Sequence, residues 1–181
     1  YPHCGTGADI VVTDIAAVGV DSAARSLMAE IAAWAKENGK TLFDLLLDAY
    51  MEYGFSQESA VSVVKPGKSG ADEIKAMMEQ FRSNPPKSLA GEQVVLVKDF
   101  KTLKQTDANG NVTDLDMPEP SNVLQYFTAK GDKVSVRPSG TEPKIKFYME
   151  AKLELAKRED YYAVKDAAIA KIEAIRKDLG V

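Results

Sequence analysis

The sequence predicts an α+β fold in which helices cover one face of a mainly antiparallel sheet. Residues 145–153 alternate apolar and polar side chains, as a strand with one buried face does. Two segments, one after Ser69 and one from about Glu159, repeat apolar residues at helical spacing. Lys130-Gly131-Asp132 lies between two strand-like runs and is typical of a hairpin.

Residues 1–54 are predicted to be helical and to form the tail of a preceding domain. Asp21 is the expected N-cap of a helix that Gly39 ends, and Thr41 is the N-cap of a second helix that Gly54 ends. The apolar positions are Ala24, Leu27, Met28, Ile31, Ala32 and Ala35 in the first helix and Leu42, Leu45, Leu46, Ala49 and Tyr53 in the second.

Residues 55–181 are predicted to form the α+β domain itself. The expected order is a strand, a helix, a strand, a long connection, two or three strands and a helix. The strands are residues 60–64, 94–97, 123–128, 133–136 and 145–153. Ser69 is the expected N-cap of the first helix, and Asn84-Pro85-Pro86 ends it. The polar residues 101–120 form the long connection, and the open face of the sheet needs a cover or a ligand.

Charge and composition exclude several classes of protein. The formal net charge of −4 argues against a general attraction to nucleic acid or to an anionic membrane. The apolar runs are far shorter than the roughly 20 residues that cross a bilayer. Cys4 is the only cysteine, so no internal disulfide is possible and a reducing cytoplasm is the expected location.

Three possible metal or nucleotide motifs are better explained by ordinary structure. His3 and Cys4 are adjacent, which is not ligand spacing for zinc. The stretch at 107–111, DANGN, resembles the start of a calcium loop, but Pro118 stands where the closing glutamate belongs. The stretch at 62–69, SVVKPGKS, lacks the first glycine of a phosphate-binding P-loop and favours a turn followed by a helix cap. We therefore expect no metal site.

The stretch at 137–144, RPSGTEPK, is the candidate binding site. Ser139 and Thr141 bring hydroxyl groups, and Gly140 is expected to adopt a positive φ that brings backbone amides close to an anion. Arg137 adds a planar guanidinium, and Lys146 on the next strand adds an ammonium group. Two other readings stay open: an inert connection between strands, and a capping box from Ser139 to Glu142, although Pro143 disfavours a helix there.

Residues 137–143, followed by 144–148 with the sequence KIKFY, resemble the phosphate-binding loop in the last domain of the α-D-phosphohexomutases, the phosphoglucomutase/phosphomannomutase family. The stretch at 121–126, SNVLQY, is similar to the family's approach to that loop, and 39–42, GKTL, to its junction near the end of the third domain. The resemblance covers roughly residues 21–178. It implies that 55–181 form a last domain with a TATA-box-binding-protein-like sheet, and that 1–54 end the third domain.

The resemblance also implies a function. Arg137, Ser139, Gly140, Thr141 and Lys146 would bind the phosphate that is not being transferred. The family interconverts hexose 1-phosphate and hexose 6-phosphate, such as those of glucose or mannose, through a 1,6-bisphosphate, using an enzyme phosphoserine and Mg²⁺. The partners implied are the phosphosugar and the remaining domains of the same enzyme.

Three family motifs are not found in this sequence: TASHNP for the phosphoserine, DGDxDR for Mg²⁺ and GEESG for the sugar. We therefore expect a C-terminal piece that has no catalytic residue, binds no cofactor and is inactive alone. The alternative is a non-catalytic module that binds protein or nucleic acid across the open sheet face. Lys144, Lys146 and Lys152 favour this alternative, but the net charge argues against nucleic acid, and neither a nucleic-acid nor a membrane partner is expected.

Overall fold

The computed structural model describes residues 22–67 and 69–181, which form two compact units. One unit contains the described residues up to Gly54 together with Glu154–Tyr161, and the other contains Phe55–Leu153 and Tyr162–Val181. The predictions made for His3, Cys4 and Asp21 lie outside the described residues.

The first unit is helical, as predicted. Helix α2 spans Ser22–Glu37 and helix α3 spans Leu42–Tyr53. Thr41 begins α3 through a capping box: its hydroxyl accepts the Asp44 amide at 3.1 Å, and the Asp44 carboxylate accepts the Thr41 amide at 2.8 Å. The predicted N-cap of α3 is therefore confirmed.

The predicted apolar stripe of α3 is partly wrong. Leu46 and Tyr53 are 42% and 80% exposed, whereas Leu42 and Leu47 are buried. The 3₁₀ helix η1, Arg158–Asp160, belongs to the same unit. Its Arg158 forms ion pairs with Asp44 and Asp48 of α3, and these pairs join the returning chain to this helix.

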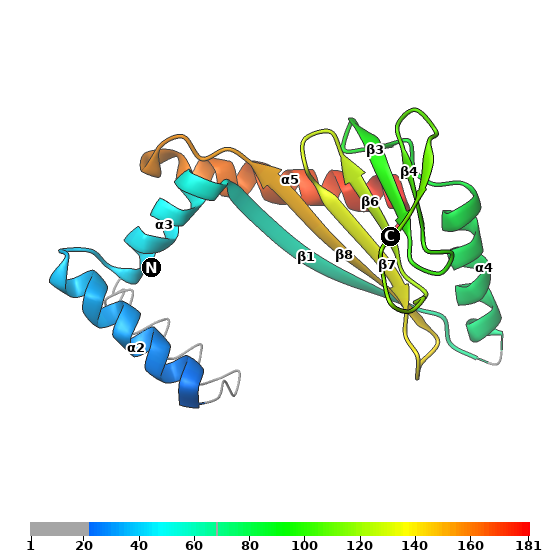
Figure 1. Ribbon diagram of the computed structural model, residues 1–181, viewed down its shortest axis with the longest axis horizontal. Helices are drawn as coiled ribbons and strands as arrows, with labels where there is room; N and C mark the ends of the chain where they lie inside the picture. The colour runs from blue at the N-terminus through cyan, green and yellow to red at the C-terminus, as the bar shows by residue number, and fades with distance from the viewer. Residues whose placement is uncertain (1–21, 68) are drawn as a thin grey trace. The chain divides into compact units, whose positions relative to one another are not determined.

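The second unit is built on an antiparallel sheet, as predicted (Figure 1). Its neighbouring strands run in the order β1, β8, β7, β6, β3, β4, β5, with β2 paired to β3 at the side. The strands are β1 Phe55–Val64, β2 Ser88–Leu89, β3 Glu92–Asp99, β4 Lys104–Asp107, β5 Val112–Asp114, β6 Leu124–Thr128, β7 Lys133–Pro138 and β8 Lys144–Leu153. Each adjacent pair is antiparallel.

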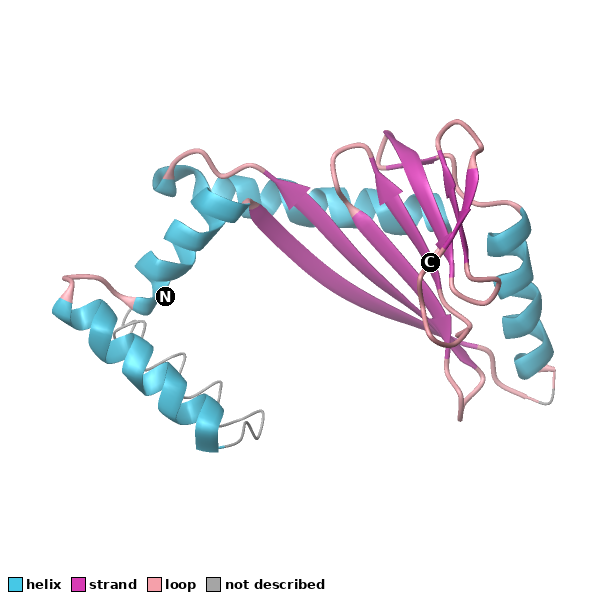
Figure 2. Ribbon diagram, viewed as in Figure 1, coloured by secondary structure: helices cyan, strands magenta, loops and turns pink. Residues whose placement is uncertain are grey.

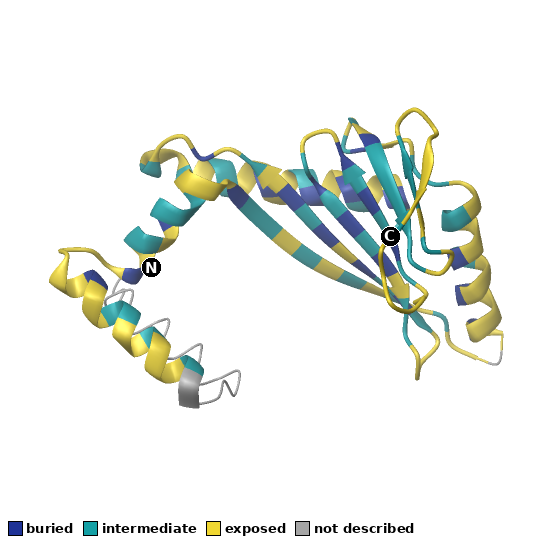
Figure 3. Cartoon of the chain, viewed as in Figure 1, coloured by how far each residue is buried: buried dark blue, intermediate teal, exposed yellow. Residues whose placement is uncertain are grey.

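Helices α4, Gly70–Ser83, and α5, Tyr161–Leu179, pack against one face of this sheet (Figure 2). The core consists of Ile74 and Met78 from α4, Ile172, Ile175 and Leu179 from α5, and Leu89, Val94, Leu124, Tyr126, Val134, Val136, Ile145, Phe147, Met149 and Ala151 from the strands. Figure 3 shows the buried residues alternating with less buried ones along β7 and β8. Burial of each large apolar side chain contributes roughly 1.5–3 kcal/mol.

Several predicted boundaries differ from the structure. Strand β1 begins at Phe55 rather than residue 60. Its polar first half also pairs with β8, so the two strands are paired along the whole length of β1. The predicted long connection contains the hairpin of β4 and β5. Its turn is stabilised by the Asp107 carboxylate, which accepts the amides of Asn109 and Asn111 at 2.8 and 2.9 Å.

Ser69 is the N-cap residue of α4, as predicted, but not through its side chain. Ser69 makes no side-chain capping bond, and its hydroxyl instead lies 3.2 Å from the Glu73 carboxylate. The helix after it begins at Gly70 and ends before Asn84-Pro85-Pro86, as predicted.

None of the helices in the described part of the chain has the length and apolar composition to cross a membrane.

Asp132 fixes the hairpin of β6 and β7 from inside. Its carboxylate is fully buried and accepts the Lys171 ammonium at 2.7 Å, the Thr128 hydroxyl at 2.7 Å and the Lys152 amide at 3.0 Å. Burial raises the pKa of Asp132, but these bonds outweigh burial and lower it below its usual 3.8. The hairpin is thereby joined to β8 and α5.

Candidate functional site

The predicted binding loop connects β7 to β8, and backbone hydrogen bonds close its base. The Ser139 amide donates to the Lys144 carbonyl at 2.8 Å, and the Lys144 amide donates to the Glu142 carbonyl at 2.7 Å. The Lys65 amide donates to the Pro143 carbonyl at 2.9 Å, which joins the loop to the end of β1. The loop is therefore held at both ends, and its tip at Gly140 and Thr141 is exposed.

A cavity of about 400 Å³ lies beside this loop, and we call it the loop hollow. Pro138–Pro143 line one part of it, and the beginning of α4, including Ala71 and Lys75, lines another. Asn122, from the segment before β6, also lines it. The volume is within the range of small-molecule sites. Ser139, Gly140 and Thr141 are thus brought together around one cavity.

Gly140 shapes the loop hollow in a way that differs from the prediction. Its φ is not positive, so the loop turns without the left-handed conformation expected there. A Cβ atom added at Gly140 would meet nothing within 4 Å. Among the described residues, the Gly140 amide has no hydrogen-bond acceptor. Gly140 therefore leaves open space at the tip of the loop, and its backbone amide is available there as a donor.

Arg137 and Lys146 lie opposite each other as paired residues of β7 and β8. Val136 points into the core, so Arg137 points to the open face of the sheet. There it lines a second cavity of about 570 Å³, the face hollow, with Ser135 and Tyr148. Arg137 does not line the loop hollow. The structure therefore brings the predicted residues together in two groups, at the end of one hairpin.

The charges near the loop are unequal. The Glu142 carboxylate forms an ion pair with Lys144. The pKa of Glu142 is lowered, first by a hydrogen bond from Lys144 and then by the positive charges of Lys144 and Lys146. The two paired charges largely cancel at neutral pH. Within the described residues, Arg137, Lys146 and Lys75 have no acidic partner within 4 Å. The surroundings of the loop therefore carry an excess of positive charge.

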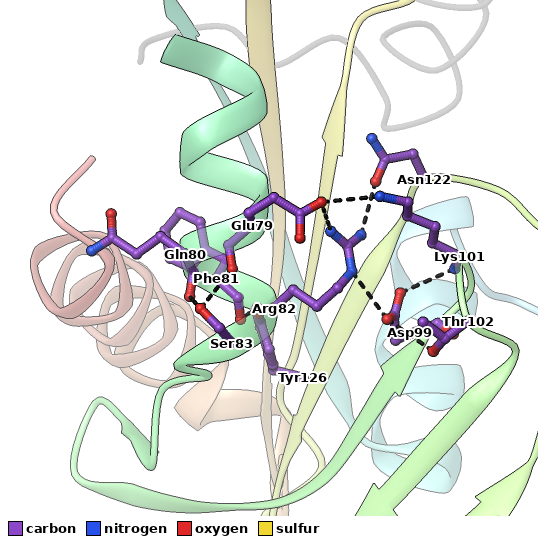
Figure 4. Close-up of polar contacts among 10 residues, drawn as sticks. All are labelled: Glu79, Gln80, Phe81, Arg82, Ser83, Asp99, Lys101, Thr102, Asn122 and Tyr126. Atoms are coloured by element: carbon purple, nitrogen blue, oxygen red, sulfur yellow. Dashed lines mark hydrogen bonds and ion pairs between the residues drawn. The ribbon is translucent and has the colours of Figure 1, made fainter. Parts of the chain in front are cut away.

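Sequence reasoning did not identify Lys75 or Asn122 as site residues. Lys75 is a surface residue of α4, and only the packing of α4 places it at the loop hollow. Asn122 belongs to the stretch at 121–126, which resembles the family, but that resemblance implied no role for the Asn122 side chain. Figure 4 shows that the Asn122 side chain contacts Arg82, whose Nη2 donates to the Asn122 Oδ1 at 2.9 Å.

In residues 22–67 and 69–181, no group of three or more His, Cys, Asp or Glu side chains is arranged to hold a metal ion.

The sequence of this chain is similar to known phosphoglucomutases. Residues 82–163 match the family model described as phosphoglucomutase/phosphomannomutase, C-terminal domain. A phosphoglucomutase of Staphylococcus epidermidis is 38% identical over 124 residues, which are 68% of this chain and 22% of that protein. A phosphoglucomutase of Staphylococcus haemolyticus is 35% identical over 119 residues, 66% of this chain and 22% of that protein.

One solved structure is also similar to this chain. The open form of the exocytosis-sensitive phosphoprotein pp63/parafusin, a phosphoglucomutase from Paramecium, aligns with 87% of this chain and 28% of its own at 15% identity and a TM-score of 0.45. The chain spans about 22% of the length of the first two curated relatives named above. By these sequence matches, the chain contains the C-terminal domain of the phosphoglucomutase/phosphomannomutase family.

Proposed function

We propose that this chain supplies the substrate-phosphate-binding domain of a phosphohexomutase, an enzyme that interconverts hexose 1-phosphate and hexose 6-phosphate through a bisphosphate. The loop hollow is the observation that carries the proposal. Ser139, Gly140 and Thr141 line this space of about 400 Å³, and they carry two hydroxyls and a backbone amide that has no acceptor among the described residues. These are the donors that a phosphate monoester accepts.

The excess positive charge supports a dianionic ligand. Lys75 lines the loop hollow, and the positive charge of Lys146 lowers the pKa of Glu142 in the loop. Hydrogen bonds to a charged group each contribute about 1.5–3 kcal/mol. Arg137, on the adjacent open face, adds a guanidinium directly before the loop. A few such bonds suffice for weak binding by this domain alone.

A site of this kind explains how one enzyme accepts both isomers. Hydroxyl, amide and ammonium groups recognise the phosphate and not the carbon that bears it, so the sugar can bind in either direction. The phosphoserine and Mg²⁺ that the reaction needs would come from the rest of the enzyme. We propose those remaining domains and the phosphosugar as the partners of this domain, and the cytoplasm as its location.

The alternative function, binding of protein or nucleic acid across the open face, receives less support. Lys133 lies 2.6 Å from the Glu150 carboxylate and Lys152 lies 3.6 Å from it, so part of the positive charge on this face is neutralised. Tyr148 is a large exposed aromatic residue there, but single-strand binding usually relies on several. Arg137 and Lys146 are on this face too, and among the described residues they have no acidic partner within 4 Å.

The proposal is tested by titrating the ¹⁵N-labelled 181-residue chain with glucose 1-phosphate and with inorganic phosphate. We expect the amide signals of Ser139, Gly140 and Thr141 to shift. Thr141→Val, which removes a hydroxyl, should weaken binding about tenfold, and Arg137→Ala should also weaken it. Lys177→Ala removes one exposed charge near the C-terminal end of α5 that does not line the loop hollow, so it is the control and should bind as the unmodified chain does.

Two outcomes would contradict this function. Shifts that bypass residues 139–141 would place the ligand elsewhere. Salt-dependent binding of RNA or DNA that a phosphosugar does not displace would favour the open-face alternative.

A further inference from the structure

Arg82 of α4 is held by three acceptors at once. Its Nε donates to Asp99 at 3.0 Å, its Nη1 to Glu79 at 2.9 Å and its Nη2 to Asn122 at 2.9 Å (Figure 4). The Arg82 and Asp99 side chains are only 14% and 13% exposed. Each of the three guanidinium nitrogens therefore donates one hydrogen bond within the chain. The role of Arg82 is to fix its neighbours.

The two carboxylates that hold Arg82 are themselves fixed. Asp99 accepts the Lys101 amide at 3.0 Å and the Thr102 hydroxyl at 2.9 Å, and Glu79 accepts the Lys101 ammonium at 3.0 Å. Figure 4 shows this network around the Arg82 guanidinium. A cation held by several fixed acceptors keeps one position, because moving it breaks several bonds together.

The Arg82 contact determines which way the Asn122 amide points. A guanidinium only donates hydrogen bonds, so the atom of Asn122 that faces it must be the oxygen. The amide nitrogen is then on the far side, as Figure 4 shows. Within the described part of the chain, this nitrogen has no acceptor. Asn122 also lines the loop hollow together with Ser139–Thr141.

We propose that Asn122 is a substrate-binding residue and that Arg82 is its positioning residue. The Asn122 amide nitrogen donates a hydrogen bond to an oxygen of the phosphosugar in the loop hollow, and Arg82 holds the amide so that it presents this donor. The inference rests on the proposed function, because it concerns the same ligand. It adds a neutral donor from a different segment of the chain to the hydroxyls and amides of the loop.

A purely structural role for Asn122 is the competing explanation, and Asn122→Asp separates the two. Aspartate keeps the acceptor for Arg82 and adds an opposite charge, so the fold should be at least as stable as before. It also removes the donor and brings a negative charge to the loop hollow. Asn109→Asp, in the exposed turn between β4 and β5, is the matched control, because it adds the same charge away from the site.

The experiment titrates the ¹⁵N-labelled 181-residue chain and follows the side-chain amide signals of Asn122. We expect these signals to shift with ligand. A shift with inorganic phosphate identifies a contact with the phosphate group, and a shift with glucose 1-phosphate alone identifies a contact with the sugar. Asn122→Asp should weaken glucose 1-phosphate binding by about tenfold or more, whereas Asn109→Asp should leave it unchanged.

Arg82 is tested by a double-mutant cycle. Arg82→Lys keeps the charge but loses the planar fork, so the amide is no longer held. We expect Arg82→Lys and Asn122→Ala each to weaken binding several-fold, and the double variant to be no weaker than Asn122→Ala alone. Core amide signals confirm at each step that the variant is folded. Additive losses would overturn the positioning role of Arg82.

The failures of the two proposals are distinguishable. If Ser139–Thr141 shift while the Asn122 side-chain signals do not, and Asn122→Asp binds as Asn109→Asp does, the role of Asn122 is overturned and the proposed function stands. If residues 139–141 do not shift with either ligand, both are overturned.

Discussion

At the scale of a single residue, a substitution at Gly140 should weaken ligand binding without changing the stability of the fold. Its φ is not positive and its missing side chain would meet nothing within 4 Å, so alanine fits the backbone. We expect Gly140→Ala to change the free energy of unfolding by less than about 0.5 kcal/mol. The added methyl group fills space at the loop hollow, so phosphate binding should weaken several-fold. Chemical denaturation and the phosphate titration measure the two effects, and a loss of stability without a loss of binding would contradict this reading.

Asp132 makes the stability of the fold depend on pH. Its pKa is lower in the folded chain than the ordinary 3.8, so the carboxylate stabilises the fold above that value, and this contribution is lost as the pH falls through the folded pKa. Asp132→Asn removes one partner of the buried pair with Lys171, whose side chain is 15% exposed, and should cost about 3 kcal/mol at pH 7.

Urea unfolding at several pH values checks the prediction for Asp132. The free energy of unfolding should decrease below about pH 4 in the unmodified chain and should decrease less steeply in Asp132→Asn. Asp116→Asn, at an exposed position, is the control and should keep the steep decrease. An unchanged slope in Asp132→Asn would show that other carboxyl groups cause the acid sensitivity.

The residue types of the loop could be predicted from sequence, but their arrangement could not. Hydroxyls, a glycine and cations within a few positions predict an anion site because they are neighbours in the chain. Lys75 and Asn122 reach the loop hollow from other elements, so no local pattern identifies them. The positive φ expected at Gly140 was wrong, because backbone bonds at Ser139 and Lys144 close the loop without it.

The start of α4 carries a prediction at the scale of elements. A Cβ atom on Gly70 would lie 1.8 Å from the Lys65 carbonyl oxygen and 3.2 Å from the Pro143 Cβ. Alanine gains up to about 1 kcal/mol of helix propensity over glycine, but the clash forces a backbone shift. Overpacking of this kind costs about 1–3 kcal/mol, so we expect Gly70→Ala to be destabilising.

Gly140→Ala is the matched control for Gly70→Ala, because it makes the same chemical change in open space. Thermal unfolding should show a lower midpoint for the Gly70 variant alone. The Lys65 amide also holds the Pro143 carbonyl, so the shift should reach the loop and change the amide signals of residues 139–141. Equal midpoints for the two variants would mean that α4 moves away from Lys65 without cost.

Elements were predictable where one face is buried and the other is not. Strand β8 alternates along its whole length and was found from sequence, and so was the apolar face of α4. Strands β4 and β5 were missed because most of their residues are polar and they pair at the exposed side of the sheet. The first half of β1 was missed for a similar reason, since backbone pairing with β8 and not apolar alternation places it.

At the scale of the whole chain, the two units should differ in stability. Most of the buried apolar residues belong to the second unit, and the described helices α2 and α3 contain only Ala35, Leu42 and Leu47. Local stability follows buried contacts. We therefore expect the amides of β6, β7 and β8 to exchange with deuterium more slowly than those of α2 and α3.

Hydrogen exchange measured on the 181-residue chain and on Arg158→Ala tests this difference. The substitution removes ion pairs to Asp44 and Asp48, so exchange should become faster in α3 and stay unchanged in the sheet. A uniform acceleration in both units would show that the chain opens as one cooperative body.

The pairing of β1 with β8 has a consequence for the order of folding. The hairpins of β6 with β7 and of β7 with β8 join neighbours in sequence, whereas β1 pairs with β8 across most of the intervening chain. Contacts between sequence neighbours close short loops and form early, and distant ones form late. The binding loop is therefore expected to be shaped in the folding nucleus before β1 arrives, so that substitutions in β1 mainly accelerate unfolding.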